Sequence, residues 1–347
     1  MKVNQIQSGQ FVDGKEIIAV ELRNDKGTLV RILNYGTIIQ QFLVSNAQGK
    51  QQDIVLGFDH VESYLTADYL ANYPYFGAII GRYANRIKDG KFTLDDVAYQ
   101  LAQNNGNDCL HGGVTGFDQK VWEIISVNET PNASVTFQYF SLDGEEHFPG
   151  DLGVQLTFEL TSNNELILNY QADTDQATPI NLTHHSYFNL GNADTIVEHV
   201  HQINASNYLE QDDNFVVTGK LIPVQNTIHD FSTSRKINSL WDQTNGYDQT
   251  YVLDKNDGDL TLAAITKAPD TGLTLQVYTT APVVHFYTAK FLNVKNGKQG
   301  KHYAEFGGFC VETQHHPNAV NIEHFPSTLL YPGEVYTQTS IYKIITP

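Results

Sequence analysis

The chain has 347 residues and a formal net charge of −18, with 21 Lys plus Arg against 39 Asp plus Glu. An acidic chain without a basic run lacks the electrostatic footprint of a nucleic-acid-binding protein, and it disfavours a membrane-surface or phosphate-rich partner. The 26 Gly, 19 Tyr and 18 Phe favour β-structure over long helices. Charged residues make up only 17%, so much of the polarity is neutral amide and hydroxyl, which is compatible with hydrogen bonding to neutral polyols.

The N-terminal residues and the cysteines indicate a compartment. Residues 1–20 carry several charged side chains and no apolar core, so we expect no signal peptide. No apolar run approaches the length of a membrane span. Cys109 and Cys310 do not make a disulfide framework, and we expect both to be small buried thiols. These features predict a soluble cytoplasmic protein.

In chain order, alternating apolar and polar residues predict short strands joined by turns. Residues 18–22 and 29–33 flank the turn Asn24-Asp25-Lys26-Gly27, which is typical of a β-hairpin. Further runs of this kind lie at 37–44, 53–58, 134–140, 154–161, 165–172, 273–279 and 283–289.

Helical patterns are few. The sequence Asp59-His60-Val61-Glu62 resembles a capping box and predicts one short helix, and residues 232–241 predict a helical turn or two. No linker, repeat or low-complexity tract divides the chain, so we expect one large, mainly antiparallel all-β domain over residues 1–347. Aromatic-rich loops around Tyr73 and Tyr208 could form cleft walls or a subunit interface.

The stretch 181–191 has the most informative pattern in the chain. Read as a strand, it places hydrogen-bonding side chains on one face, namely Asn181, Thr183, His185, Tyr187 and Asn189. The opposite face is mostly apolar, with Ile180, Leu182, Phe188 and Leu190. A strand of mixed polarity usually turns its polar face to water. An imidazole at the centre of such a face is also what the wall of a polar cleft would present.

The candidate chemistry-bearing residues lie in separate segments, each beside a glycine or a turn: Arg86, His111, His185, Asp248 and Glu312. An imidazole titrates near neutral pH and a partly desolvated carboxylate can be raised toward it, so one His and one Glu can exchange protons at pH 7. Each residue also has a structural interpretation. Arg86 could be a surface arginine, Asp248 a turn-capping residue and His111 a core histidine.

Other chemistries find little support in the spacing. There is no G-x-G-x-x-G and no Walker lysine for a nucleotide, and no G-x-S-x-G elbow for a serine nucleophile. His184 and His185 are adjacent and point to opposite faces of a strand, and the pair His199 and His201 is a weak metal signal by itself. We therefore predict neither a metal nor a cofactor.

Several motifs together give the chain a resemblance to the galactose mutarotase, or aldose 1-epimerase, family from about residue 33 to the C-terminus. They are Asn34-Tyr35-Gly36, Gly81-Arg82-Tyr83-Ala84-Asn85-Arg86-Ile87, Leu110-His111-Gly112-Gly113, residues 181–190, Asn245-Gly246-Tyr247-Asp248 and residues 308–314. The resemblance implies a large antiparallel β-supersandwich with few short helices and an open sugar cleft. It also implies a cofactor-independent isomerase of carbohydrate metabolism, a mutarotase for free aldohexoses such as galactose and glucose.

The resemblance also implies roles for individual residues. His185, in Thr183-His184-His185-Ser186-Tyr187-Phe188, would be the acid that protonates the pyranose ring oxygen, and Glu312 the base that takes the anomeric hydroxyl proton. The remaining expected sugar-binding residues are Asn85, Arg86, His111, Tyr187, Asp248 and His285. His285 is a departure, because the family frequently has Gln there, and we expect it to affect which sugar is preferred.

The sequence is also compatible with other functions. A maltose epimerase of the same fold needs only a cleft that is open beyond the sugar, and a lectin-like binding protein would keep the cleft without catalysis. A hexose-phosphate epimerase would want clustered Arg or Lys, and a glycosidase two carboxylates flanking the bond. We expect a small-molecule monosaccharide substrate, or maltose, and a monomer or homodimer.

Overall fold

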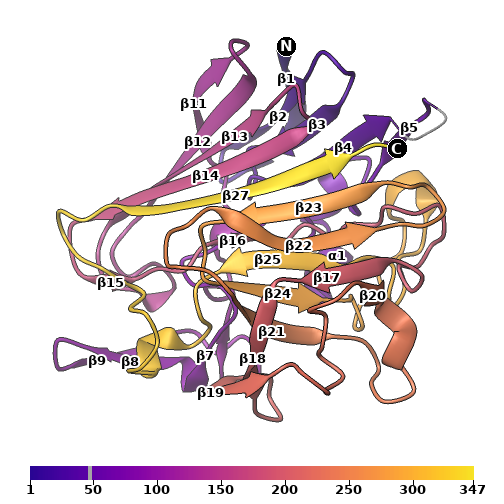
Figure 1. Cartoon of the computed structure of the whole chain (residues 1–347). Helices are drawn as coiled ribbons and strands as arrows, with labels where there is room; N and C mark the ends of the chain where they lie inside the picture. Colours follow the sequence, from indigo (N-terminus) through magenta and orange to yellow (C-terminus); the bar gives the residue numbers. More distant parts are fainter. Residues whose placement is uncertain (46–48) are drawn as a thin grey trace.

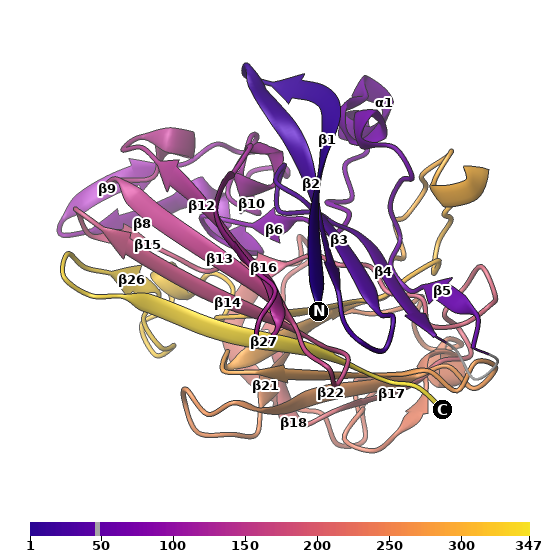
Figure 2. The same ribbon diagram turned by 90° about the horizontal axis from the view of Figure 1, so that it is seen from above.

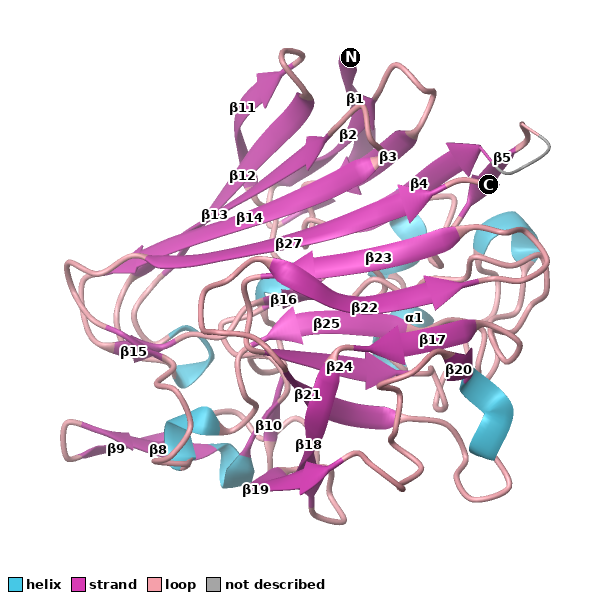
Figure 3. Ribbon diagram, in the orientation of Figure 1, coloured by secondary structure: helices cyan, strands magenta, loops and turns pink. Residues whose placement is uncertain are grey.

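The computed structural model describes residues 1–45 and 49–347, and almost all of its regular structure is antiparallel β-sheet (Figures 1 and 3). The largest sheet has nine strands, in the order β11 (Glu123–Asn128), β12 (Ala133–Ser141), β13 (Leu152–Leu160), β14 (Glu165–Thr174), β27 (Tyr336–Ile345), β23 (Thr274–Thr279), β22 (Thr261–Lys267), β17 (Val200–Ile203) and β20 (Arg235–Lys236). The C-terminal strand β27 thus lies in the middle of the sheet. The predicted all-β class is confirmed.

Two five-stranded sheets accompany the large one. The N-terminal sheet has the order β1 (Lys2–Val12), β2 (Lys15–Arg23), β3 (Leu29–Leu33), β4 (Ile39–Ser45) and β5 (Gln51–Asp53). The other has the order β19 (Val217–Pro223), β18 (Ala205–Gln211), β21 (Asp248–Leu253), β24 (Val283–Tyr287) and β25 (Cys310–Gln314). The hairpin predicted around residues 24–27 is confirmed as β2 and β3.

Short pairs and turns complete the structure. The paired strands are β6 (Ile79–Ile80) with β16 (Thr183–His184), β7 (Arg86–Ile87) with β10 (Cys109–Leu110), β8 (Lys91–Leu94) with β9 (Val97–Gln100), and β15 (Thr178–Pro179) with β26 (Leu329–Leu330). Helical structure comprises α1 (Ala67–Ala71) and the 3₁₀ turns Val61–Leu65, Lys88–Gly90, Phe117–Gln119, Glu145–His147, Ile237–Leu240, Lys298–Gly300 and Ala319–Asn321. No helix among the described residues is long and apolar enough to cross a membrane.

The core lies between the sheets, and strict alternation in the strands builds it. In β13 every second side chain from Leu152 to Leu160 is fully buried, and burying one such Leu or Phe is worth about 1.5–3 kcal/mol. The same cluster contains Val20 of β2, Phe158 of β13 and Val311 of β25, so all three large sheets contribute to it. Figure 2 shows the N-terminal sheet beside the strands β12 to β14.

The stretch 181–191 is not the continuous strand that its pattern predicts. Only Thr183 and His184 pair as a strand, with β6. Beyond them the backbone bonds to different neighbours: His185 N donates to Ala78 O, Phe188 exchanges hydrogen bonds with Phe309, and Asn189 N donates to Ile54 O. These hydrogen bonds go to three different segments, so residues 181–191 do not form one continuous strand with a single polar face. The predicted burial of the apolar side, Ile180, Leu182, Phe188 and Leu190, is confirmed.

Two smaller predictions fail for local reasons. The predicted strand 53–58 extends only to Asp53, apart from an isolated bridge at Val55. The short helix predicted through Tyr64 and Leu65 is present as the 3₁₀ turn Val61–Leu65, but the capping box is not formed. The residue before the turn is His60, whose side chain makes no cap hydrogen bond, and Asp59 Oδ2 accepts from Gln299 N instead. Thr66 caps the next helix instead, accepting from the N–H of Tyr69.

Arg82 ties the segment before the candidate site to the hairpin of β12 and β13. Its guanidinium is 2% exposed and donates to Ser141 Oγ at 2.8 Å and to the carbonyls of Ser141, Leu142, Pro149 and Gly150. Burial lowers the pKa of Arg82 to about 10, a shift that the charge of Glu145 opposes. One buried side chain therefore supplies donors to four backbone carbonyls and a hydroxyl of this hairpin and the segment that follows β12.

We predict that Arg82→Leu lowers the free energy of unfolding by at least ~3 kcal/mol, because several buried carbonyls lose a charged donor. Urea denaturation of wild type and variant measures this. Arg31→Leu is the matched control, since Arg31 pairs with Glu21 at a partly exposed position and should cost about 1 kcal/mol or less. Equal losses in the two variants would contradict the assigned role.

Candidate active site

One cavity of about 320 Å³ collects the residues that the sequence singles out. Its lining includes all eight expected site residues: Asn85, Arg86, His111, His185, Tyr187, Asp248, His285 and Glu312. They come from the 81–87 segment, the 110–113 loop, the irregular 181–191 stretch and three adjacent strands, β21, β24 and β25. The structure therefore brings together residues that the sequence leaves far apart, while their roles stay predictions.

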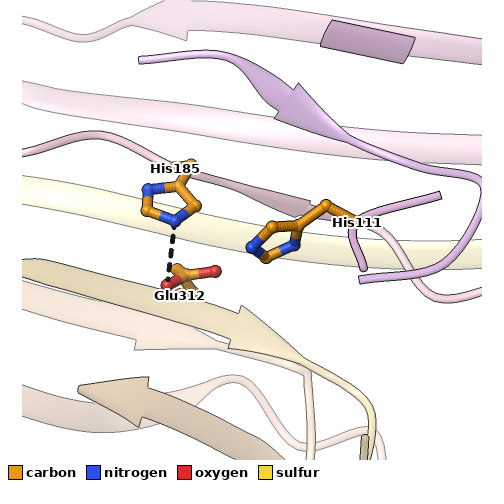
Figure 4. A group of neighbouring side chains, drawn as sticks. All are labelled: His111, His185 and Glu312. Atoms are coloured by element: carbon orange, nitrogen blue, oxygen red, sulfur yellow. Dashed lines mark ion pairs between the residues drawn. The ribbon is translucent and has the colours of Figure 1, made fainter. Parts of the chain in front are cut away.

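His185 and Glu312 face each other at the centre of this cavity (Figure 4). His185 Nε2 lies 3.6 Å from Glu312 Oε1, and the two residues are 5% and 1% exposed. On the other side of the imidazole, Nδ1 lies 3.5 Å from the Sγ of Cys310, and the ring of Tyr187 stacks on it with centroids 5.1 Å apart. Cys310 and Glu312 share a face of β25, as their spacing predicts.

One oxygen of Glu312 stands out. Oε2 is buried and has no hydrogen-bond partner within residues 1–45 and 49–347. Leaving a buried carboxylate oxygen unpaired is costly, so such an atom usually has a function. Oε2 is therefore available to accept a proton or a hydrogen bond from a ligand in the cavity.

His185 and His111 differ in their protonation. Burial lowers the pKa of His185 below 6.5, and the carboxylate of Glu312 opposes this shift. Burial, reinforced by the nearby His185 and Arg86, brings the pKa of His111 well below 6.5. The N–H of Asn85 donates to His111 Nδ1 at 3.2 Å, which leaves the proton of the neutral ring on Nε2. His111 is thus a fixed hydrogen-bond donor, and His185 is the imidazole better able to exchange a proton.

Glycines set the position of His111. Gly112 has φ +91°, and an added Cβ would lie 2.0 Å from the carbonyl oxygen of Gly81. The 110–113 loop can therefore pack directly on the backbone that precedes Asn85.

Asp248 and His285 form a second pair in the cavity. His285 Nε2 lies 2.9 Å from Asp248 Oδ1, and its Nδ1 lies 2.8 Å from Thr250 Oγ1. Burial raises the pKa of the Asp248 carboxyl, but the hydrogen bond and charge of His285 and the charges of Lys290 and Arg86 outweigh it, so the pKa lies below its usual value. Both ring nitrogens of His285 are therefore engaged by other side chains of the protein.

Arg86 and Asn85 complete the polar wall. Arg86 Nε donates to Asn105 Oδ1 at 3.1 Å, and burial lowers the pKa of the guanidinium, opposed by Asp248. Asn85 Oδ1 accepts from the N–H of Arg86, so its Nδ2 hydrogens are the donors that it can offer a ligand. Asn85 adopts φ +61°, which Asn tolerates better than most residues.

The sequence indicates the loop around Tyr73 as a possible cleft wall but does not identify Tyr75 as a neighbour of the candidate histidines. Tyr75 lies 4.8 Å from the ring of His111 and stacks at 5.9 Å on His185, and Tyr73 lies 4.4 Å from Tyr75, all between ring centroids. The loop around Tyr73 is therefore a cleft wall. Tyr208 instead packs on His229, away from this cavity. The only sequence feature that pointed to these loops was their high content of tyrosine, and this does not distinguish tyrosines that pack in the core from tyrosines that contact a ligand.

The catalytic candidates could also be metal ligands. His111, His185 and Glu312 each offer an atom within 4.8 Å of the others, a donor set that suits Zn²⁺. Spacing could not reveal this group, because its members come from three distant segments. The histidine pairs considered from the sequence do not converge. His199 Nε2 accepts from Leu190 N, and His201 Nδ1 bonds Thr266.

Comparisons with known proteins agree with this geometry. The chain matches the family model described as aldose 1-epimerase over residues 19–343. It is 41% identical to galactose mutarotase from Sus scrofa, covering 90% of this chain and 89% of that protein. A solved aldose epimerase homologue from C. elegans has a TM-score of 0.87 at 31% identity, covering 94% of this chain and 98% of that one. Galactose 1-epimerase from Lactobacillus acidophilus gives a TM-score of 0.85 at 26% identity, covering 99% and 98%. These similarities confirm the predicted β-supersandwich.

Asp118 is a buried carboxyl group beside Tyr73, and its pKa makes the stability of the protein depend on pH. It is 1% exposed, and burial raises its pKa to about 7, opposed by Tyr73. The folded chain therefore keeps a proton that the unfolded chain releases above about pH 4. As the pH rises from 4 to 7, the cost of deprotonating Asp118 in the folded chain should lower the free energy of unfolding by roughly 4 kcal/mol.

We predict that Asp118→Asn becomes more stable relative to wild type as the pH is raised from 5 to 8, because the amide has no proton to lose. Urea denaturation at both pH values checks this, with the exposed Asp96→Asn as control. A difference between Asp118→Asn and wild type that is the same at pH 5 and pH 8 would contradict the prediction.

Proposed function

Because this chain belongs to the aldose 1-epimerase family, we propose that its cleft interconverts the α and β anomers of free aldohexoses with Glu312 as base and His185 as acid. The chain is an isomerase of the aldose epimerase class. Relatives named galactose mutarotase support galactose as a substrate, and glucose differs from it only in the configuration at C4.

One observation carries the assignment of the base and the acid. Glu312 presents a buried, unpartnered Oε2, while its other oxygen faces His185 Nε2 at 3.6 Å. Anomerisation needs one group that removes a proton from the O1 hydroxyl and another that delivers a proton to the ring oxygen. A carboxylate and an imidazole held across one site meet that need, provided that neither is locked in one charge state.

The proton transfers balance as follows. Glu312 Oε2 takes the O1 proton while protonated His185 gives its proton to O5, so that C1=O1 forms as the C1–O5 bond breaks. The open-chain aldehyde rotates about C1–C2. O5 then attacks C1 from the other face and returns its proton to His185, while Glu312 returns its proton to O1. Since burial lowers the pKa of His185, its imidazolium is a stronger acid than that of free histidine.

The other polar side chains would hold the sugar during ring opening. His111 Nε2–H and the Arg86 guanidinium would donate to oxygens near C1, where negative charge develops on O1. Asp248 would accept from hydroxyls at the opposite edge of the ring, and Asn85 would donate to a neighbouring hydroxyl. Tyr187 would support the imidazole of His185, on which it stacks.

The setting of the enzyme is also part of the proposal. An acidic chain with this cleft would act on a free monosaccharide in the cytoplasm, within galactose and hexose metabolism, as a monomer or homodimer. No metal or cofactor takes part in the steps above. The burial of residues from Val20 to Ile344 in one hydrophobic cluster supports a single domain over the chain.

We predict that His185→Asn and Glu312→Gln each lower kcat for anomerisation by roughly 10²- to 10⁴-fold, the usual worth of a positioned acid or base. Polarimetry of freshly dissolved α-galactose and α-glucose measures this against the spontaneous rate, with the exposed His302→Gln as control. A near-wild-type rate in either variant would contradict the assignment of that residue as the acid or the base. A wild type that binds sugar without accelerating the rotation would favour a sugar-binding protein instead.

We predict that His285→Gln changes the ratio of kcat/KM between galactose and glucose by about 5-fold, the worth of roughly one hydrogen bond. The two sugars differ at C4, on the edge assigned to Asp248, and Gln would hold Asp248 through a longer, more flexible side chain than the imidazole that bonds Asp248 and Thr250. Kinetics on both sugars measure the ratio. An unchanged ratio would show that His285 does not influence sugar preference.

A further inference from the structure

The 110–113 loop, which carries His111, has an unusual backbone. His111, Gly112 and Gly113 follow one another with φ angles of +54°, +91° and +117°. Glycine adopts such angles readily, whereas a left-handed histidine is uncommon and persists where the surrounding structure holds it. The contacts that hold this loop therefore decide where the imidazole of His111 lies.

Asn104 binds the loop on both sides of His111. Its Oδ1 accepts from the N–H of Leu110 at 2.7 Å. Its Nδ2 donates to the carbonyl of Leu110 at 2.9 Å and to that of Gly113 at 2.7 Å. One amide side chain thus makes three hydrogen bonds to the backbone that flanks His111, and it satisfies donors and acceptors that a left-handed loop cannot pair within itself.

Glu146 binds the two residues that follow the loop. Its Oε2 accepts from the N–H of Val114 at 2.9 Å, and its Oε1 accepts from the N–H of Thr115 at 3.0 Å. Hydrogen bonds to a carboxylate are stronger than those between neutral groups. A Cβ added to Gly113 would clash with Glu146 Oε2, so the glycine allows this approach. Glu146 itself has φ +48°, in the connection between β12 and β13.

The loop in turn sets the direction of the imidazole. The N–H of His111 donates to the carbonyl of Asn85 at 3.0 Å, and the N–H of Asn85 donates to His111 Nδ1 at 3.2 Å. The Nε2–H group therefore keeps its direction only while the backbone of His111 stays beside Asn85. A misplacement of about 1 Å in an active site can cost roughly 10²-fold in rate.

We propose that Asn104 and Glu146 are positioning residues for catalysis. They hold the loop in its left-handed conformation, so that His111 Nε2–H stays at the sugar oxygen on which negative charge develops. Both lie outside the lining of the cavity and act on the sugar through His111. The inference rests on the proposed aldose epimerase mechanism and adds two residues to it.

Near-isosteric variants test the two residues by polarimetry of freshly dissolved α-glucose. Asn104→Asp keeps the acceptor for Leu110 but turns an oxygen toward two carbonyls, and Glu146→Gln loses one of its two acceptors. Each should lower kcat about 10-fold and leave KM within about twofold, because His111 acts on charge that develops in the transition state. Glu129→Gln is the matched control, since the exposed Glu129 accepts from the N–H of Val3, and it should keep the wild-type kcat. Asn104→Ser replaces Asn104→Asp if the latter does not fold.

A double-mutant cycle with His111→Ala separates positioning from a general structural role. Added to His111→Ala, the variants of Asn104 and Glu146 should change kcat by less than about twofold, because the group that they position is gone. A wild-type kcat in either single variant would overturn the role of that residue. The same loss of kcat with and without His111, or a wild-type kcat in His111→Ala alone, would overturn the proposal. A wild type that does not accelerate the rotation of glucose would instead overturn the proposed function itself.

Discussion

The buried contact between Glu312 and His185 is the constraint on which the site depends. Burial lowers the pKa of His185, and the carboxylate of Glu312, 3.6 Å from its Nε2, opposes that shift. Oε2 of Glu312, which has no hydrogen-bond partner in the part of the chain that the structure describes, adds an acceptor that a ligand can satisfy. A site balanced in this way can pass protons in both directions, which a reversible anomerisation requires.

The sheets place these groups with little freedom to move. Glu312 lies in β25 directly opposite His285 of β24, and His285 in turn holds Asp248 in β21. His185 is not in a sheet of comparable length, yet its backbone is bound on both sides, to Gly77 and Ala78. His185 and Glu312 therefore come from two differently built walls of the cavity.

Sequence reasoning succeeded where the determining interactions are local. Alternation and a turn identified the β2–β3 hairpin, and period two placed Cys310 and Glu312 on one face. It failed for 181–191, because that backbone bonds to segments more than 100 residues away that no local pattern reveals. Resemblance to a family, rather than spacing, gathered the eight site residues. Tyr75 and Asp118 were missed because their chemistry arises only from their tertiary neighbours.

The pH dependence of kcat/KM for glucose anomerisation, measured from pH 5 to 9 in wild type and in the residual activity of His185→Asn, tests the central claim most directly. The wild-type profile should fall toward alkaline pH as His185, whose pKa burial lowers, loses its proton. The alkaline fall should be absent from His185→Asn. A flat wild-type profile, or the same alkaline fall in both proteins, would contradict the assignment of His185 as the acid.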